Sequence, residues 1–127
     1  HLTLHFLGEQ SVARLAALID AVQVPVTPFE LSLGSARLWP GGIAVLEPDT
    51  VSAALTELHR ALADALQAGG WPTERRAFRP HVTLARRAGP SRPPLSFRSL
   101  IWPVRGFALV ASRPGPPRHY AVLHRVG

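Results

Sequence analysis

The chain has 127 residues, which fits one domain or two small lobes, and its lack of cysteine excludes disulfides, thiolate metal sites and a cysteine nucleophile. Its net charge of +6 comes from arginine without lysine, which favours an anionic partner, although GC-rich coding would produce the same composition. No apolar run is long enough to span a membrane and no signal peptide opens the chain, so we expect no membrane partner and a cytoplasmic location.

The first half of the chain alternates between strand and helix patterns. Residues 1–7 (HLTLHFL) have the alternation of a half-buried strand: His1, Thr3 and His5 face one way, and Leu2, Leu4 and Phe6 are expected to face the core. Ser11 is a candidate N-cap for an amphipathic helix that ends before Pro25. Alternation returns at 29–34, and a further strand is predicted at 43–47 after a Pro-Gly-Gly turn.

A second, longer helix is predicted over residues 51–68. Asp49 and Thr50 are its candidate caps, and Gly69 and Gly70 end it, as glycine commonly does just past a helix. Residues of one apolar stripe recur at helical spacing and are expected to face the core. They are Val51, Leu55, Leu58, Leu62 and Leu66.

The last part of the chain has strand patterns. Residues 79–86 (RPHVTLAR) repeat the alternation of residues 1–7, and a proline-rich loop that we expect to be mobile follows at 88–94. This order predicts one α+β domain over residues 1–127, whose two halves each contribute a His-x-Thr strand. Three short strands are expected to finish the chain, near 95–98, 104–111 and 119–126.

The pattern His-x-Thr-x occurs twice in matching strand contexts, as HLTL (1–4) and HVTL (81–84). Two such motifs with apolar flanks would arise by chance in roughly one shuffled chain in a thousand. Positions i and i+2 of a strand project from the same face, so each imidazole stands beside its own hydroxyl. Two such strands placed side by side would gather two histidines and two threonines around one cleft.

This constellation suits in-line displacement at phosphorus. One neutral histidine takes a proton from water, and the other, protonated, donates to the departing ribose oxygen. Threonine hydroxyls hydrogen-bond the non-bridging oxygens, where charge is concentrated in the transition state. Imidazoles with a pKa of about 6.5 can do both jobs near neutral pH without a metal or another cofactor. His1 and His81 are therefore the predicted catalytic pair, and Thr3 and Thr83 the predicted phosphate ligands.

The two motifs and their flanks carry a family resemblance. HLTLHFLGE (1–9) and FRPHVTLARR (78–87) resemble the two signatures of the two-histidine phosphoesterases, specifically the bacterial RNA 2′,3′-cyclic phosphodiesterases historically called 2′-5′ RNA ligases. Residues 107–126 resemble the closing hairpin of that family. The resemblance implies a bilobal α+β fold, in which two antiparallel sheets related by a pseudo-two-fold axis flank a central groove and helices lie outside.

The resemblance also implies an activity and partners. The activity is metal-free hydrolysis of a terminal RNA 2′,3′-cyclic phosphate to a 2′-phosphate, with 2′-5′ ligation as the reverse reaction. The expected partners are RNA ends, such as tRNA fragments or oligonucleotides, and nucleotides, and we expect a monomer. Arg86 matches an arginine often found after the second motif. Strict alternation puts Arg86 on the face opposite His81, so a role at the phosphate requires a bulge or the end of the strand.

The sequence departs from the family at its beginning. Family members usually start with a strand upstream of the first motif, and this sequence lacks it. Such a strand would cover an edge of the first lobe. Because the sequence also does not begin with methionine, we expect it to be part of a longer gene product.

A further histidine lies in the first strand pattern. His5 shares the face of His1 and Thr3 and is a candidate substrate contact. His1, His5 and His81 together could also be zinc ligands, but neither motif has a carboxylate to complete a hydrolytic metal site. We therefore expect no metal.

Two other functions remain open from the sequence: a non-catalytic RNA-binding domain, and a phosphodiesterase for a small nucleotide such as an ADP-ribose cyclic phosphate. Tyr120, Trp39 and Trp71 are candidates for stacking on a base, with core packing as the alternative. The two motifs are too alike to tell which histidine is the base and which is the acid.

Overall fold

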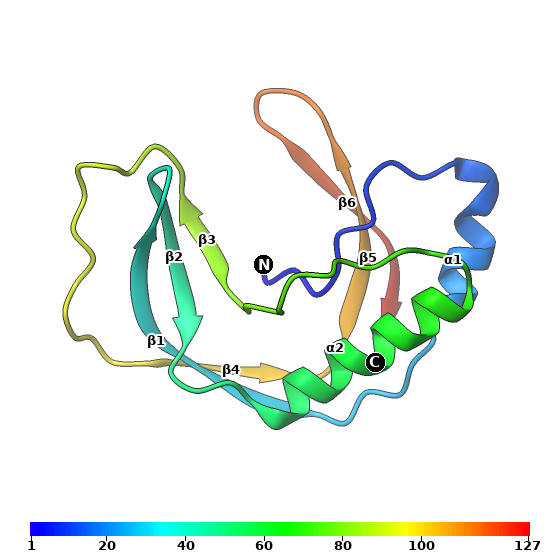
Figure 1. Cartoon of the computed structure of the whole chain (residues 1–127), viewed down its shortest axis with the longest axis horizontal. Helices are drawn as coiled ribbons and strands as arrows, with labels where there is room; N and C mark the ends of the chain where they lie inside the picture. Colours follow the sequence, from blue (N-terminus) through cyan, green and yellow to red (C-terminus); the bar gives the residue numbers. More distant parts are fainter.

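The computed structural model describes residues 1–127 and shows an α+β fold with two antiparallel sheets, as predicted (Figure 1). The larger sheet has the strand order β3-β2-β1-β4, and the smaller one is the β5–β6 hairpin. No helix is long and apolar enough to cross a membrane. The strands are β1 (Phe29–Trp39), β2 (Ile43–Pro48), β3 (Val82–Ala85), β4 (Leu100–Val104), β5 (Phe107–Arg113) and β6 (His119–Val126). The helices are a 3-10 turn (Val12–Arg14) that leads into α1 (Leu15–Ala21), and α2 (Ala53–Ala68).

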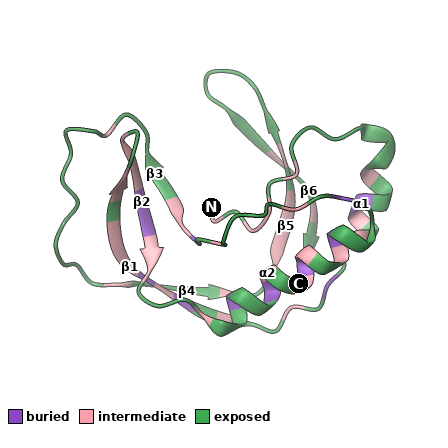
Figure 2. Cartoon of the chain, in the orientation of Figure 1, coloured by how far each residue is buried: buried purple, intermediate pink, exposed green.

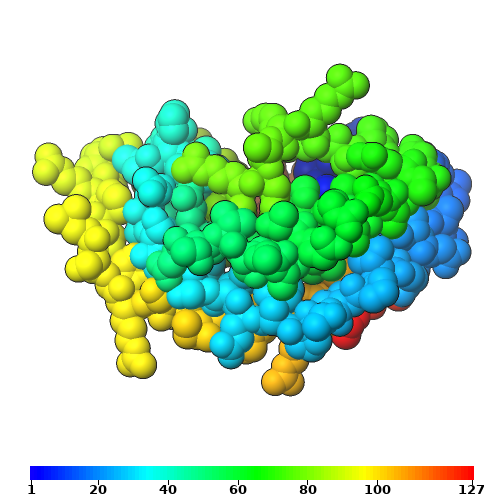
Figure 3. All heavy atoms as spheres, turned by 60° about the horizontal axis from the view of Figure 1, so that its bottom comes forward, coloured from blue at the N-terminus to red at the C-terminus, as the bar shows by residue number.

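The two sheets stand on opposite sides of the molecule, and the N-terminal segment runs between them (Figure 1). Both helices lie on the side of the β5–β6 hairpin. Figure 3 shows α2 (green) on one half of the surface and the β1–β2 hairpin (cyan) with the loop after β3 (yellow) on the other. The sheets have four and two strands, so they are not equivalent. The predicted pseudo-symmetry therefore relates the two motifs and does not extend to the whole sheets.

The main hydrophobic core joins the two helices to the β5–β6 hairpin (Figure 2). Four leucines of the predicted stripe of α2 are buried, because their spacing puts them on one face of the helix. The buried members of this core are Leu18, Val22, Val24, Leu58, Leu62, Leu66, Trp71 and Val126.

The start of α2 differs from the prediction. Ser52 is its N-cap, because the Ser52 side chain accepts a hydrogen bond from the Leu55 N–H at 3.3 Å. The predicted caps Asp49 and Thr50 lie upstream of this position. Val51 therefore precedes the helix and is exposed, so its assignment to the buried stripe was wrong.

Two strand predictions were also wrong. Residues 1–7 form no strand, because their backbone meets a partner at one position only, an antiparallel bridge from Leu2 to Val82. Phe6, expected in the core, is consequently exposed. Residues 95–98 are irregular, and β4 begins later and contains Pro103. β4 tolerates this proline because it is an edge strand of its sheet.

A β-bulge at Gly34 in β1 packs closely against a small cluster of polar side chains. The register of β1 against β2 shifts between Leu33 and Ser35, which leaves Gly34 as the extra residue. The Asp49 carboxylate accepts hydrogen bonds from Ser99 Oγ, at 2.9 Å, and from a serine hydroxyl of β1. A Cβ on Gly34 would lie 2.1 Å from Asp49 Oδ1 and 2.2 Å from Ser99 Oγ, so only glycine fits without displacing this cluster.

We expect Gly34→Ala to lower the free energy of unfolding by about 1–3 kcal/mol, because the new methyl group must break these hydrogen bonds. Gly89→Ala is the matched control, because a Cβ at Gly89 would meet nothing within 4 Å. Its effect should stay within about 0.5 kcal/mol. Urea denaturation of the two variants measures the difference, and equal midpoints would contradict this account of Gly34.

Candidate active site

One antiparallel bridge brings the two His-x-Thr motifs together. Leu2 pairs with Val82. In an antiparallel pair, the residue before one partner lies across from the residue after the other, so each histidine lies across from the threonine of the other motif. His1, Thr3 and Thr83 are exposed, whereas the two bridge residues are partly buried. The structure thus joins the four predicted site residues in one place, and their roles remain predictions.

The larger sheet adds polar side chains on the face of the second motif. Val45 of β2 lies opposite Thr83 of β3. Glu47, two positions along β2, is therefore on the same face and adjacent to His81. Trp39 of β1 reaches this face too, and the centroid of its ring is 4.3 Å from that of the His81 imidazole. Trp39 thus packs against a predicted catalytic residue.

The His81 ring is held at one of its two nitrogens. Its Nδ1 is 2.8 Å from the carbonyl oxygen of Arg79. Because a carbonyl can only accept a hydrogen bond, Nδ1 carries the hydrogen. Nε2 is then the nitrogen left for proton transfer, as a base when it is bare and as an acid when it is protonated.

His1 packs against the smaller sheet. Its ring and that of Tyr120 on β6 meet edge to face, with centroids 5.0 Å apart. Tyr120 is half-exposed, so one side of its ring can still meet a ligand. Both sheets therefore contribute to the site, and the predicted substrate contact of Tyr120 would lie next to His1.

A groove of about 400 Å³ opens beside His1. Val82 and Leu84 alternate with His81 and Thr83, so the groove lies mainly on the other face of the larger sheet. Apart from His1, its lining is apolar and comes from β1 to β4: Leu33, Leu46, Val82, Leu84, Leu100, Ile101, Trp102 and Pro103.

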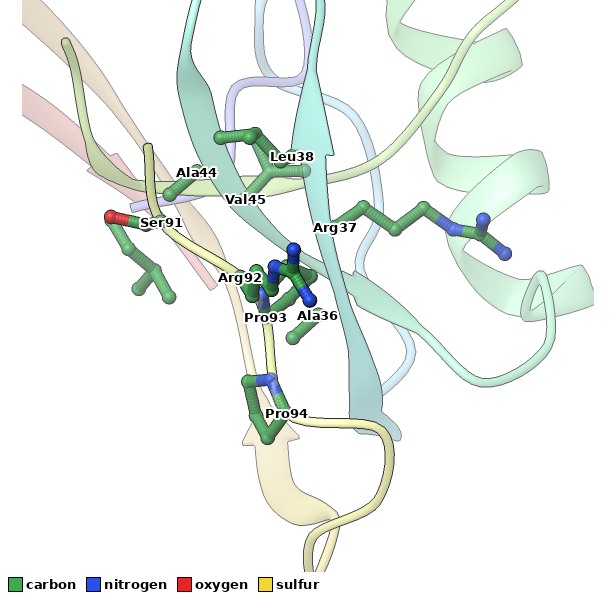
Figure 4. Close-up of a pocket in the computed structure, with 10 residues that line it drawn as sticks. Ala36, Arg37, Leu38, Ala44, Val45, Ser91, Arg92, Pro93 and Pro94 are labelled. Atoms are coloured by element: carbon green, nitrogen blue, oxygen red, sulfur yellow. The ribbon is translucent and has the colours of Figure 1, made fainter. Parts of the chain in front are cut away.

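A smaller pocket of about 150 Å³ lies between the β1–β2 hairpin and the proline-rich loop (Figure 4). Ser91, Arg92 and Pro93 line it from the loop side. The Ala88 N–H donates to the Gly42 carbonyl at 2.8 Å, which ties the start of this loop to the hairpin.

A role for Arg86 at the phosphate requires either a bulge in β3 or the end of that strand, and β3 has both. The register shift between Ala44 and Val45 of β2 leaves Leu84 as an extra residue in β3. This bulge displaces the alternation by one place, and the strand then ends at Ala85. Arg86 follows directly and is exposed. The strand alternation therefore does not hold it on the face opposite the motif, and its contact with phosphate remains a prediction.

His5 packs against helix α2. Its ring stacks on that of His59 with centroids 4.1 Å apart, and its Nε2 is 2.9 Å from the His59 carbonyl oxygen. Phe78 stacks on the other side of His59, with centroids 3.8 Å apart. This contact anchors the first motif to α2, and a substrate contact of His5 stays a prediction.

Two residues at the site were not singled out from the sequence. Glu47 and Arg79 lie beside His81 and are joined by an ion pair of 2.7 Å. Two signals were available in the sequence. Glu47 is a charged residue at the end of the apolar run IAVLE, and Arg79 lies two residues before His81. Across the chain, no group of three or more His, Asp or Glu side chains is arranged to hold a metal ion.

Comparison with known proteins identifies a single family. The sequence profile of the 2′-5′ RNA ligase superfamily matches residues 1–112. An RNA 2′,3′-cyclic phosphodiesterase from Thermus thermophilus is 34% identical over an alignment that covers 98% of this chain and 70% of that protein. A crystal structure of E. coli LigT with 3′-AMP has a TM-score of 0.85 and 29% identity, over 98% of this chain and 74% of LigT. A phosphoesterase crystal structure has a TM-score of 0.86, 30% identity and the same coverage.

The stack of His5 on His59 predicts that stability depends on pH. Burial and the charge of His5 lower the pKa of His59 from its ordinary 6.5, against an opposing hydrogen bond with the Leu4 backbone. The unfolded chain therefore binds a proton more readily than the folded one in the interval below pH 6.5. The free energy of unfolding should fall as the pH drops from 6.5 towards about 5.5 and should change little between 6.5 and about 7.5.

His59→Phe should flatten this dependence, because phenylalanine keeps the stack and binds no proton. Melting temperatures between about pH 5.5 and about pH 7.5 measure the slope. The control is His119→Ala at an exposed position, which should keep the wild-type slope. Parallel slopes for His59→Phe and the wild type would show that His59 does not cause the dependence.

Proposed function

Since this chain belongs to the 2′-5′ RNA ligase superfamily and is an RNA 2′,3′-cyclic phosphodiesterase, we propose that it opens the cyclic phosphate with His1 and His81 as an acid–base pair. RNA is accordingly the kind of partner on which it acts. The observation that carries the proposal is the bridge between Leu2 and Val82, because it joins the two motifs at one position.

The proposed step is in-line attack of water on phosphorus. One histidine takes a proton from the water as its oxygen bonds to phosphorus. The bond between phosphorus and the ribose 3′ oxygen breaks, and the other histidine gives that oxygen a proton. The product is a 2′-phosphate beside a free 3′ hydroxyl. The two histidines have then exchanged their protonation states, and solvent restores them.

Side chains around the pair have proposed supporting roles. The hydroxyls of Thr3 and Thr83 donate to the non-bridging oxygens, where negative charge accumulates. Arg86 offers a planar fork of donors that matches a phosphate. Tyr120, next to His1, offers an aromatic face on which a terminal base stacks.

We expect His1→Ala and His81→Ala each to lower kcat/KM on an oligonucleotide with a 2′,3′-cyclic phosphate by about 10²–10⁴-fold, because each removes one proton transfer. Product analysis should identify a 2′-phosphate, and wild-type turnover should survive a chelator. His119→Ala is the control for loss of an exposed histidine.

Three outcomes would count against this assignment. An inert wild type that still binds the oligonucleotide would support a binding domain. Faster turnover of an ADP-ribose cyclic phosphate would support a small-nucleotide substrate. Loss of activity with chelator and recovery with zinc would overturn the acid–base mechanism.

The threonine hydroxyls have a sharper test. Thr83→Val keeps the shape of the side chain and removes its hydroxyl, so kcat/KM should fall by about 100-fold. Thr83→Ser keeps the hydroxyl and should recover most of the activity. Steady-state kinetics on the same cyclic-phosphate oligonucleotide compares them, and equal losses in both variants would show that the hydroxyl is not the group that matters.

A further inference from the structure

The carboxylate of Glu47 joins three side chains beside His81. Its Oε1 accepts from Trp39 Nε1 at 2.8 Å, and from Nε and Nη2 of Arg79 at 2.9 and 2.7 Å. Its Oε2 is 3.2 Å from Arg37 Nε, and the Glu47 side chain is only 13% exposed. The carboxylate is thus held in one place by charged and neutral donors.

Two of these partners also contact His81. The Trp39 ring packs against the imidazole, and the Arg79 carbonyl accepts from His81 Nδ1. The Arg79 guanidinium lies over the Trp39 ring, 4.5 Å from its centroid. Glu47, Arg79, His81 and Trp39 therefore form a closed ring of contacts, in which each member restrains the next.

His81 needs such a restraint because the sheet does not supply one. β3 begins at Val82, so His81 and Arg79 precede the hydrogen-bonded ladder. The Arg79 carbonyl can hold the imidazole only if its own peptide is fixed. The bond from the Arg79 side chain to Glu47 ties this residue to β2, which lies inside the sheet. The imidazole orientation thus depends on an acid that it does not itself need to touch.

We propose that Glu47 is a positioning residue that orients His81 for proton transfer through Trp39 and Arg79, a role that rests on the function proposed above. Glu47 keeps hydrogen on Nδ1 of His81 and directs Nε2 to the substrate. The first motif has a different support, since His1 packs on Tyr120. The two similar motifs therefore present their imidazoles in different ways.

Glu47→Gln tests this role, because it keeps the size and one acceptor oxygen while removing the charge. Its kcat on the cyclic-phosphate oligonucleotide should fall about 10- to 100-fold with KM within about twofold, as expected for a misplaced catalytic group. Nitrogen-15 NMR of the histidine rings should show His81 changing from one Nδ1–H tautomer to a mixture. Asp49→Asn is the matched control. Asp49 lies two residues after Glu47, but its carboxylate accepts hydrogen bonds from Ser32 and Ser99.

Trp39→Phe is the second variant. It keeps a ring against His81 and removes the indole N–H that Glu47 accepts, so it should lower kcat in the same direction. The losses of kcat in Trp39→Phe and Glu47→Gln should not be additive in the double variant, because both substitutions break the same ring of contacts. If Glu47→Gln does not fold, Trp39→Phe decides the question by the same readings.

A folded Glu47→Gln variant with wild-type kcat and an unchanged His81 tautomer would overturn the proposal, even if its melting temperature fell. The tautomer is read without turnover, so it tests Glu47 independently of the reaction. A wild type that does not hydrolyse the oligonucleotide, or a His81→Ala variant that does so fully, would instead reject the proposed function. The two failures are therefore distinguishable.

Discussion

The proposed active site depends on a single antiparallel pairing, that of Leu2 with Val82. The two His-x-Thr motifs pair antiparallel through their middle residues. A two-fold rotation about this pair therefore places each motif on the other. The pairing therefore sets each histidine across from the other motif's threonine. One bridge cannot hold the site by itself, so each side needs its own anchor. The second motif is anchored by β3, and the first by the packing of Leu4 and Leu7 on the core and by the bond from His5 to α2.

The surroundings of the two histidines differ although their motifs match. His81 is enclosed by Trp39 and by Arg79, which Glu47 holds, whereas His1 meets the half-exposed Tyr120. Hydrolysis of a cyclic phosphate requires one base and one acid, which two equivalent imidazoles would not distinguish. If His1 and His81 are the acid–base pair proposed above, the asymmetry between the lobes provides a physical basis for dividing the two proton transfers between them.

Features that depend on local spacing were predictable. The stripe of α2 follows from leucines on one helical face, so its buried residues were found without coordinates. Features that depend on partners were not. Residues 1–7 have a strand pattern but lack a continuous neighbour, and β4 contains a proline that would argue against a strand unless its place at the sheet edge is known.

The sequence alone predicted the class of chemistry, because strand alternation would put each histidine on the same face as its threonine and the repeat of the motif indicates a paired site. Only the tertiary structure decided how the two motifs meet and what supports them. Glu47 and His81 are far apart along the chain, and they become neighbours through the register of β2 against β3. That register depends on hydrogen bonds between distant segments, which no local pattern of residues encodes.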